Sequence, residues 1–372
     1  MCGMKNVGFI LLAALAALAG CNPESPRGEL DAERGDDAFA ARDYAAAAKA
    51  FEKALEQDAT NVVLAVKLAF ARVAMGDGDG ARQAAAAART IDPGSAEAML
   101  AEGQAAWLLK DEAAARAAFA RVAAEKALPG EIRSQAYTAL AVVEIGANAY
   151  DAARVALWRA LRLDRRNAAV WYHLGHLSRV TYNFEEAAVE QYGMAAQLFA
   201  ASDPRAREVQ RSVIPALRES INRRKSTMSG VSNRDPEASA KLVAAAEALK
   251  AKDVKAAEAK FLAAWEKDAF SHKAAGEWAR LAAVHPKTVD ANKVLDAFQA
   301  AIDGRPNAQA VYQAAARFAL TASRPMRAER MLSQALAHDP EAKASLDLYV
   351  DALRRVGKAK ESALYAEYRK EL

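Results

Sequence analysis

Helix-like segments of this chain end at a repeated interval of about 34 residues. The ends lie at Asp58, Asp92 and Lys126, again at Asp164 and Leu198, and late in the chain at Asp339. A period of this size indicates a stacked array, in which no single unit buries its own apolar face. The sequence therefore predicts an all-α solenoid, and solenoids usually bind other molecules rather than catalyse reactions.

Composition agrees with a helical array and excludes some partners. The chain is rich in Ala, Glu, Lys, Leu and Arg, with only 18 Gly and 11 Pro, which favours helix almost throughout. The formal net charge is +4, and it falls to +3 once the one lysine of the first twenty residues is removed. Such a small charge does not indicate a nucleic-acid partner.

Residues 1–20 are predicted to be a secretory signal. Lys5 precedes an apolar run from Val7 to Ala19, which is shorter than the approximately 20 apolar residues of a membrane-spanning helix. The run ends in Leu18-Ala19-Gly20-Cys21, which resembles the bacterial lipoprotein signal. That resemblance implies that Cys21 becomes the lipidated first residue. An ordinary signal peptide with a chance cysteine, or an uncleaved anchor, are the alternatives.

Cleavage before Cys21 would remove Cys2 and leave one cysteine, so neither an internal disulfide nor a cysteine-based metal site is expected. A diacylated or triacylated cysteine, carrying a chain such as palmitate, supplies the multiple acyl chains that stable anchoring needs. Asn22 stands where an inner-membrane retention signal of this family would place Asp. We therefore expect an outer-membrane anchor facing the periplasm, with residues 21–31 as a tether.

The repeat units resemble the tetratricopeptide repeat (TPR) family, whose units are two antiparallel helices. The first-helix signature is Trp171-Tyr172-His173-Leu174-Gly175, and Trp278, Leu281 and Ala282 repeat it with Ala for Gly. Small and aromatic residues of second helices, and closing prolines, fall at Ala47, Phe51, Ala54, Ala115, Phe119, Ala187, Ala257, Phe261, Ala264, Pro93, Pro306 and Pro340. The resemblance implies an α-solenoid of about eight to nine such helix pairs, stacked into a right-handed superhelix.

The register breaks once, so we expect two arrays. Val209, Val213, Leu217 and Ile221 form one apolar stripe of a helix over 203–225, in which Pro215 can introduce a kink. A polar loop over 226–236 follows. The expected organisation is a signal at 1–20, a tether at 21–31, an array at 32–201, a capping helix and linker at 202–236, and an array at 237–372.

No cofactor, metal or catalytic site is expected. His173 and His176 share a helix face, but two imidazoles do not make a zinc site. Residues 76–80 read Gly-Asp-Gly-Asp-Gly, which is typical of a turn and lacks the glutamate of a calcium loop. The basic run that ends at Lys225 could meet acidic groups, although helix C-terminal charge is the simpler interpretation.

The family resemblance implies that first helices line a concave groove for partners. The groove positions carried onto this chain are Val66, Phe70, Val73, Leu100, Gln104, Trp107, Tyr172, His176, Arg179, Gln313 and Arg317. Phe70, Trp107 and Tyr172 are the large residues among them, and aromatic and Arg side chains are common interface anchors. A shift of one position in this alignment would return Trp107 to the core.

The resulting expectation is a non-catalytic, lipid-anchored scaffold that binds protein or peptide partners in the bacterial envelope, for example in an outer-membrane, pilus or polysaccharide-export assembly. A periplasmic lipoprotein that binds a substrate or peptide is an alternative, as is a regulatory subunit of a cell-wall enzyme. An enzyme with a site between the arrays, near His272 and His285, has no further support in the residues.

Overall fold

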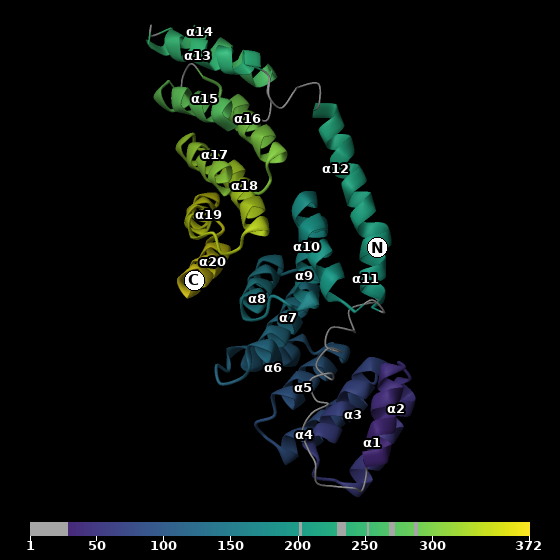
Figure 1. Ribbon diagram of the computed structural model, residues 1–372. Helices are drawn as coiled ribbons and strands as arrows, with labels where there is room; N and C mark the ends of the chain where they lie inside the picture. Colours follow the sequence, from purple (N-terminus) through teal and green to yellow (C-terminus); the bar gives the residue numbers. More distant parts are fainter. Residues whose placement is uncertain (1–28, 201–202, 229–235, 251–252, 268–271, 286–288) are drawn as a thin grey trace. The chain divides into compact units, whose positions relative to one another are not determined.

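The computed structural model describes residues 29–200, 203–228, 236–250, 253–267, 272–285 and 289–372 (Figure 1). All regular structure in these ranges is helical, which confirms the all-α prediction. Cys21, the signal peptide and most of the tether lie outside the described residues. Within the described ranges, no helix combines the length and apolar character that crossing a bilayer requires.

Contacts divide the chain into two compact units, with the first ending at Leu174 and also holding Gln197–Phe199. The second unit holds Gly175–Ala196 and the chain from Ala200 onward. The helices up to this division are α1 (Glu29–Ala40), α2 (Tyr44–Gln57), α3 (Val62–Met75), α4 (Gly78–Ile91), α5 (Ala96–Leu108), α6 (Glu112–Ala124), α7 (Gly130–Gly146), α8 (Tyr150–Leu163) and α9 (Ala168–His176).

The second unit continues with two short π-helices and a longer series of α-helices. These are η3 (Leu177–Thr181), α10 (Glu185–Leu198), α11 (Pro204–Glu208), η4 (Val209–Val213), α12 (Ile214–Met228), α13 (Pro236–Lys250), α14 (Val254–Lys267), α15 (His272–Val284), α16 (Ala291–Gly304), α17 (Gln309–Thr321), α18 (Pro325–His338), α19 (Lys343–Val356) and α20 (Ala359–Glu371). The predicted division into arrays at 202–236 stays a prediction, because 201–202 and 229–235 are outside the described residues.

The repeat period has a local cause in the turn within each early helix pair. Arg42, Gly76 and Lys110 adopt left-handed backbone conformations with φ of 64°, 78° and 61°. The residue after each is an aspartate, and each aspartate carboxylate accepts a hydrogen bond from a backbone N–H of the following helix. Such N-caps satisfy one of the donors that a helix start leaves free. A left-handed residue followed by a capping aspartate therefore ends one helix and begins the next.

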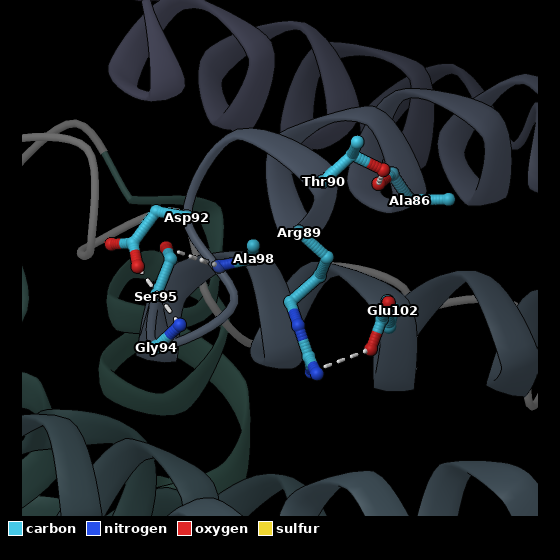
Figure 2. Close-up of polar contacts among 8 residues, drawn as sticks. All are labelled: Ala86, Arg89, Thr90, Asp92, Gly94, Ser95, Ala98 and Glu102. Carbon is cyan, nitrogen blue, oxygen red and sulfur yellow. Dashed lines mark hydrogen bonds and ion pairs between the residues drawn. The ribbon is translucent and has the colours of Figure 1, made fainter.

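The turn between repeats is also held by side chains, as the α4–α5 junction shows (Figure 2). Asp92 accepts a hydrogen bond from the Gly94 N–H at 2.8 Å, and the Ser95 hydroxyl accepts one from the Ala98 N–H at 3.2 Å. Arg89 of α4 forms an ion pair with Glu102 of α5 at 3.2 Å. The predicted helix end at Asp92 is thus a capped turn.

Close packing within a pair depends on a small residue of the first helix against the ring of the second. Gly103 lies on the buried ring of Phe119, and Gly35 lies on Phe51 in the same way. The pair α3–α4 uses two fully buried alanines, Ala69 and Ala85, at the corresponding positions. The helices can therefore approach closely because one partner lacks a large side chain.

The fifth pair departs from this spacing through a π-helix. Gly175 lies against Tyr192, and these two residues are one position further apart in the sequence than Gly103 and Phe119. The π-helix η3 lies between them at the end of α9, and a π-turn accommodates one extra residue in a helix. The small-aromatic contact is therefore preserved despite the insertion.

The helix expected over 203–225 is present as α11, η4 and α12. The π-helix η4 lies immediately before the Ile214-Pro215 step, where proline removes one backbone donor. Of the predicted stripe, Val209, Leu217 and Ile221 are buried, at 1%, 6% and 9% exposure. The expected loop at 226–236 begins later, because α12 continues to Met228.

Candidate partner-binding surfaces

Phe70 does not lie on an exposed groove. It is 4% exposed and belongs to the core of the first unit, as does Val66 at 2%. The reason lies in the neighbouring first helices, where Ala71, Ala101 and Ala105 are fully buried. Small residues let α3 and α5 pack directly against each other, and Phe70 belongs to the core cluster that includes residues of both helices. Phe70 therefore does not occupy the exposed position expected of a groove residue.

Trp107 is the large aromatic of α5 that stays half-buried. Its indole ring packs on Gly146 at the end of α7, where no side chain stands in the way. Gln104, one turn earlier on α5, is also half-buried. These two residues form the α5 surface of the first unit, and the packed indole keeps an accessible part of the ring in a fixed orientation. A rigid, partly exposed aromatic has the properties of an interface anchor.

Tyr172 is half-buried and sits among aromatic rings in the first unit. Its ring centroid lies 5.5 Å from that of His173 and 6.1 Å from that of Phe199, both in edge-to-face geometry. Trp171 next to it donates a hydrogen bond from its indole N–H to the Arg165 carbonyl at 2.8 Å. The first-helix signature therefore builds an aromatic cluster, part of which remains accessible.

Two buried cations of the first unit are structural. Lys67, 6% exposed, donates to Asp36 at 2.7 Å and so joins α3 to α1. Arg154, 2% exposed, pairs with Asp151 at 3.2 Å and lies over the Trp158 ring at 5.1 Å. Burying a charge is expensive unless it is paired. These pairings explain both cations without any ligand.

His176 and Arg179 lie one turn apart in the second unit, across the junction of α9 and η3. Burial, and then the positive charge of Arg179, lowers the pKa of His176 below its ordinary value. The imidazole is therefore neutral at neutral pH, while the exposed Arg179 keeps its charge. No group of three or more His, Cys, Asp or Glu side chains gathers as metal ligands in the part of the chain that the structure describes.

A polar contact within the second unit joins α10 to α18, and we name it the α10–α18 contact. Gln191, which is 4% exposed, donates from its amide to the Ala337 carbonyl at 2.8 Å and accepts from the Ser178 hydroxyl at 2.7 Å. Beside it, Glu190 lies 2.8 Å from Nδ1 of His338. Both polar atoms of the buried Gln191 amide are thereby satisfied, which favours a specific docking of α10.

Electrostatics at the α10–α18 contact favours the charged carboxylate. Burial acts to raise the pKa of Glu190, but hydrogen bonding and charge from His338, with a further hydrogen bond from Asn307, lower it on balance. Burial, with the charges of Asp303 and the α10 carboxylates, raises the pKa of the Tyr312 phenol. Tyr312 is fully buried, and its hydroxyl has no hydrogen-bond partner among the described residues. A buried hydroxyl without a partner costs stability.

Gln313 and Arg317 lie on α17 in different surroundings. Gln313 is half-buried and donates to the Ser345 hydroxyl of α19 at 3.2 Å, while Ser345 donates to Gln309 at 2.9 Å. Gln313 therefore helps to hold α17 and α19 together. Arg317 is exposed and remains accessible to a partner.

The sequence did not indicate the α10–α18 contact. Glu190 and His338 are 148 residues apart, and neither belongs to a recognisable motif. The repeat pattern specifies contacts between neighbouring units, but it holds no information about pairs so distant along the chain. Only the extra position between Gly175 and Tyr192 marks α10 as different from other second helices.

A cavity of about 420 Å³ lies between α19 and α20 in the second unit. Its lining consists of Asp347, Val350, Arg354, Ala366, Arg369 and Lys370. Arg369 forms an ion pair with Asp347 across the two helices, with Nε 3.0 Å from Oδ1. The lining therefore combines two apolar side chains with three cations and one carboxylate.

Residues 38–89 match a family model described as tetratricopeptide repeat. Similar solved structures include MamA from Desulfovibrio magneticus RS-1, at 16% identity over 49% of this chain and 99% of that chain, with a TM-score of 0.37. PilF of Pseudomonas aeruginosa is 16% identical over 64% of this chain and 90% of its own, with a TM-score of 0.39. Human IFIT1 is 15% identical over 92% and 72%, with a TM-score of 0.37. No curated protein sequence matches the chain.

Proposed function

Because residues 38–89 match the tetratricopeptide repeat model, we propose that this chain is a repeat scaffold that binds other proteins and that lipid on Cys21 holds it at a membrane of the bacterial envelope. The observation that carries the binding role is the α5 surface, where the Trp107 ring rests on Gly146 beside the half-buried Gln104. The ring loses little conformational freedom on binding, because packing already orients it.

The anchoring part of the proposal rests on the sequence Leu18-Ala19-Gly20-Cys21 and the apolar run before it. Acyl chains on Cys21 would hold the protein at a bilayer surface, and the residues before α1 would act as its tether. Asn22 favours the outer membrane, facing the periplasm. An assembly complex of that membrane, such as one for protein insertion, pili or polysaccharide export, is the proposed setting.

Partner capture in intact cells tests the binding role. Crosslinking followed by mass spectrometry should recover one or more envelope proteins with the wild-type chain. Trp107→Ala should weaken capture, because loss of an aromatic anchor typically costs about 2 kcal/mol, or about 30-fold in Kd. Gln104→Arg changes the same surface without removing packing, and Arg82→Gln on the exposed face of α4 serves as the control.

Equal recovery from wild type, Trp107→Ala and Gln104→Arg would refute a role for the α5 surface. Recovery of no envelope protein above background would contradict the scaffold role itself.

Fractionation tests the anchor separately. Cys21→Ala should move the protein from the membrane fraction to the soluble fraction, because the acylated thiol is lost. Cys21→Ser is the matched variant that keeps the size of the side chain. A protein that stays in the membrane fraction after either substitution is not held there by lipid on Cys21.

A further inference from the structure

The cavity between α19 and α20 occupies the position where, in the preceding pair, the next helix packs. Helices α17 and α18 are followed by α19, which contacts both of them. Moving one repeat period along the chain leads from α17–α18 to α19–α20, since Gln309 corresponds to Lys343 and Pro325 to Ala359. By this correspondence, the groove of α19–α20 lies where a helix or an extended segment would pack.

The residues of this groove differ in kind from those of the groove that α19 fills. The corresponding pairs, one repeat period apart, are Leu320 and Arg354, Ala335 and Arg369, and Leu336 and Lys370. The three residues of the earlier groove are buried, at 6%, 0% and 0% exposure. Apolar side chains that a helix covers have thus been replaced by three cations, while Val350 and Ala366 remain as the apolar part of the lining.

The cations are arranged to accept a negative charge. Asp347 holds Arg369 through two contacts, with Nε 3.0 Å from Oδ1 and Nη2 donating to Oδ2 at 3.2 Å. The remaining guanidinium hydrogens stay available, because an Arg side chain has five donors in a fixed plane. Arg354 and Lys370 are exposed, and neither forms an ion pair within the described part of the chain. The lining therefore carries three positive charges and one negative charge.

We propose that the α19–α20 groove binds a carboxylate-bearing segment of a partner protein. Arg354, Arg369 and Lys370 would pair with the carboxylates, and the segment's apolar side chains would contact Val350 and Ala366. The proposal rests on the protein-binding function and names one class of partner for it. A charged surface that serves only solubility would show no preference for carboxylates.

Fluorescence anisotropy with labelled peptides tests the site on the full chain. The probe is a fluorescein-labelled peptide of alternating Glu and Leu with an amidated C-terminus. A Gln–Leu peptide with an amidated end removes the charge, and a Gln–Leu peptide with a free end supplies only a terminal carboxylate. The protein variants are Arg354→Glu combined with Lys370→Glu, the milder Arg354→Gln, and the control Arg330→Glu on the exposed face of α18.

The wild-type protein should bind the Glu–Leu peptide, and the double charge reversal should weaken that binding by about tenfold or more. Arg354→Gln should weaken it less, and Arg330→Glu should leave it nearly unchanged. If only the free-ended Gln–Leu peptide binds, and the double variant does not bind it, the site is supported and its carboxylate comes from a chain terminus. Circular dichroism establishes that the variants are folded.

Measurable binding of the amidated Glu–Leu and Gln–Leu peptides with the same affinity, or equal binding of a peptide by wild type and the double variant, would overturn the proposal. Absence of binding by all three peptides would overturn it as well. If the double variant still captures the wild-type partners in cells, the scaffold function stands while the groove loses its role. If the peptide binds but no partner is captured in cells, the proposed scaffold function fails, while the preference of the groove for carboxylates stands.

Discussion

Gly103 is where the packing of a helix pair can be tested most sharply. A Cβ added to Gly103 would lie 2.5 Å from Cε1, 2.8 Å from Cδ1 and 2.9 Å from Cζ of Phe119. The ring cannot move away freely, because it is 2% exposed. Overpacking of this kind costs about 1–3 kcal/mol, while replacing Gly by Ala within a helix contributes up to about 1 kcal/mol. We expect Gly103→Ala to destabilise the protein by roughly 1 kcal/mol overall.

The double variant Gly103→Ala with Phe119→Ala separates these two terms. Phe119→Ala alone should cost about 3–5 kcal/mol, because it leaves a cavity. In that background, Gly103→Ala should stabilise by about 0.5–1 kcal/mol, since only the helix propensity remains. The resulting pair would resemble the buried Ala69 and Ala85 of the neighbouring repeat.

Urea unfolding followed by circular dichroism measures these differences, and amide hydrogen exchange locates them in α5 and α6. Gly276→Ala is the control, because a Cβ there would meet nothing within 4 Å. The control should be neutral or stabilising. If Gly103→Ala stabilises the wild-type chain as much as it stabilises the Phe119→Ala background, close packing of Phe119 on Gly103 does not limit the residue at position 103.

Three further predictions concern turns, pH and the second unit. Gly76→Ala should lower the free energy of unfolding by about 1–2 kcal/mol, because φ there is 78°. Lys110→Gly should raise it by up to about 1 kcal/mol, because Lys110 has a φ of 61°. If thermal unfolding shows no change for both variants, the left-handed turn does not have the role described. The pKa of Glu190 is lowered in the folded chain, so its contribution is present above the ordinary value of 4.5 and is lost as the pH falls through the folded value. The protection factors of α18 amides, which correct hydrogen exchange for its intrinsic pH dependence, should therefore fall in acid, and Glu190→Gln should flatten that response. Gln191→Leu should accelerate exchange in α18 at neutral pH, because the bond to the Ala337 carbonyl is removed; unchanged exchange would contradict the α10–α18 contact.

Much of the fold could be predicted from the sequence because the repeat is encoded locally. The predicted ends at Asp58, Asp92, Asp164 and Asp339 are all C-cap positions of helices. The turn at Gly76-Asp77 is likewise where one helix ends and the next is capped. Capping and left-handed turns depend on residues close in sequence, so a periodic pattern is enough to locate them.

The binding surface was less predictable because it depends on distances between repeats. The family positions place Phe70 and Trp107 on the same kind of surface, yet one is core and the other half-buried. Phe70 lies in the core cluster to which both α3 and α5 contribute, whereas Gly146 supports the ring of Trp107 at a half-buried position. The spacing of neighbouring first helices is a tertiary property, and it decides which positions face solvent.

The most direct test of the central claim, that the α5 surface binds protein partners, is site-specific photocrosslinking in intact cells. A photoreactive phenylalanine analogue would replace Gln104 on that surface in one variant, and Arg82 on the exposed side of α4 in another. We predict discrete protein adducts from position 104 and none from position 82. Adducts of equal yield from both positions, or from position 82 alone, would contradict the account.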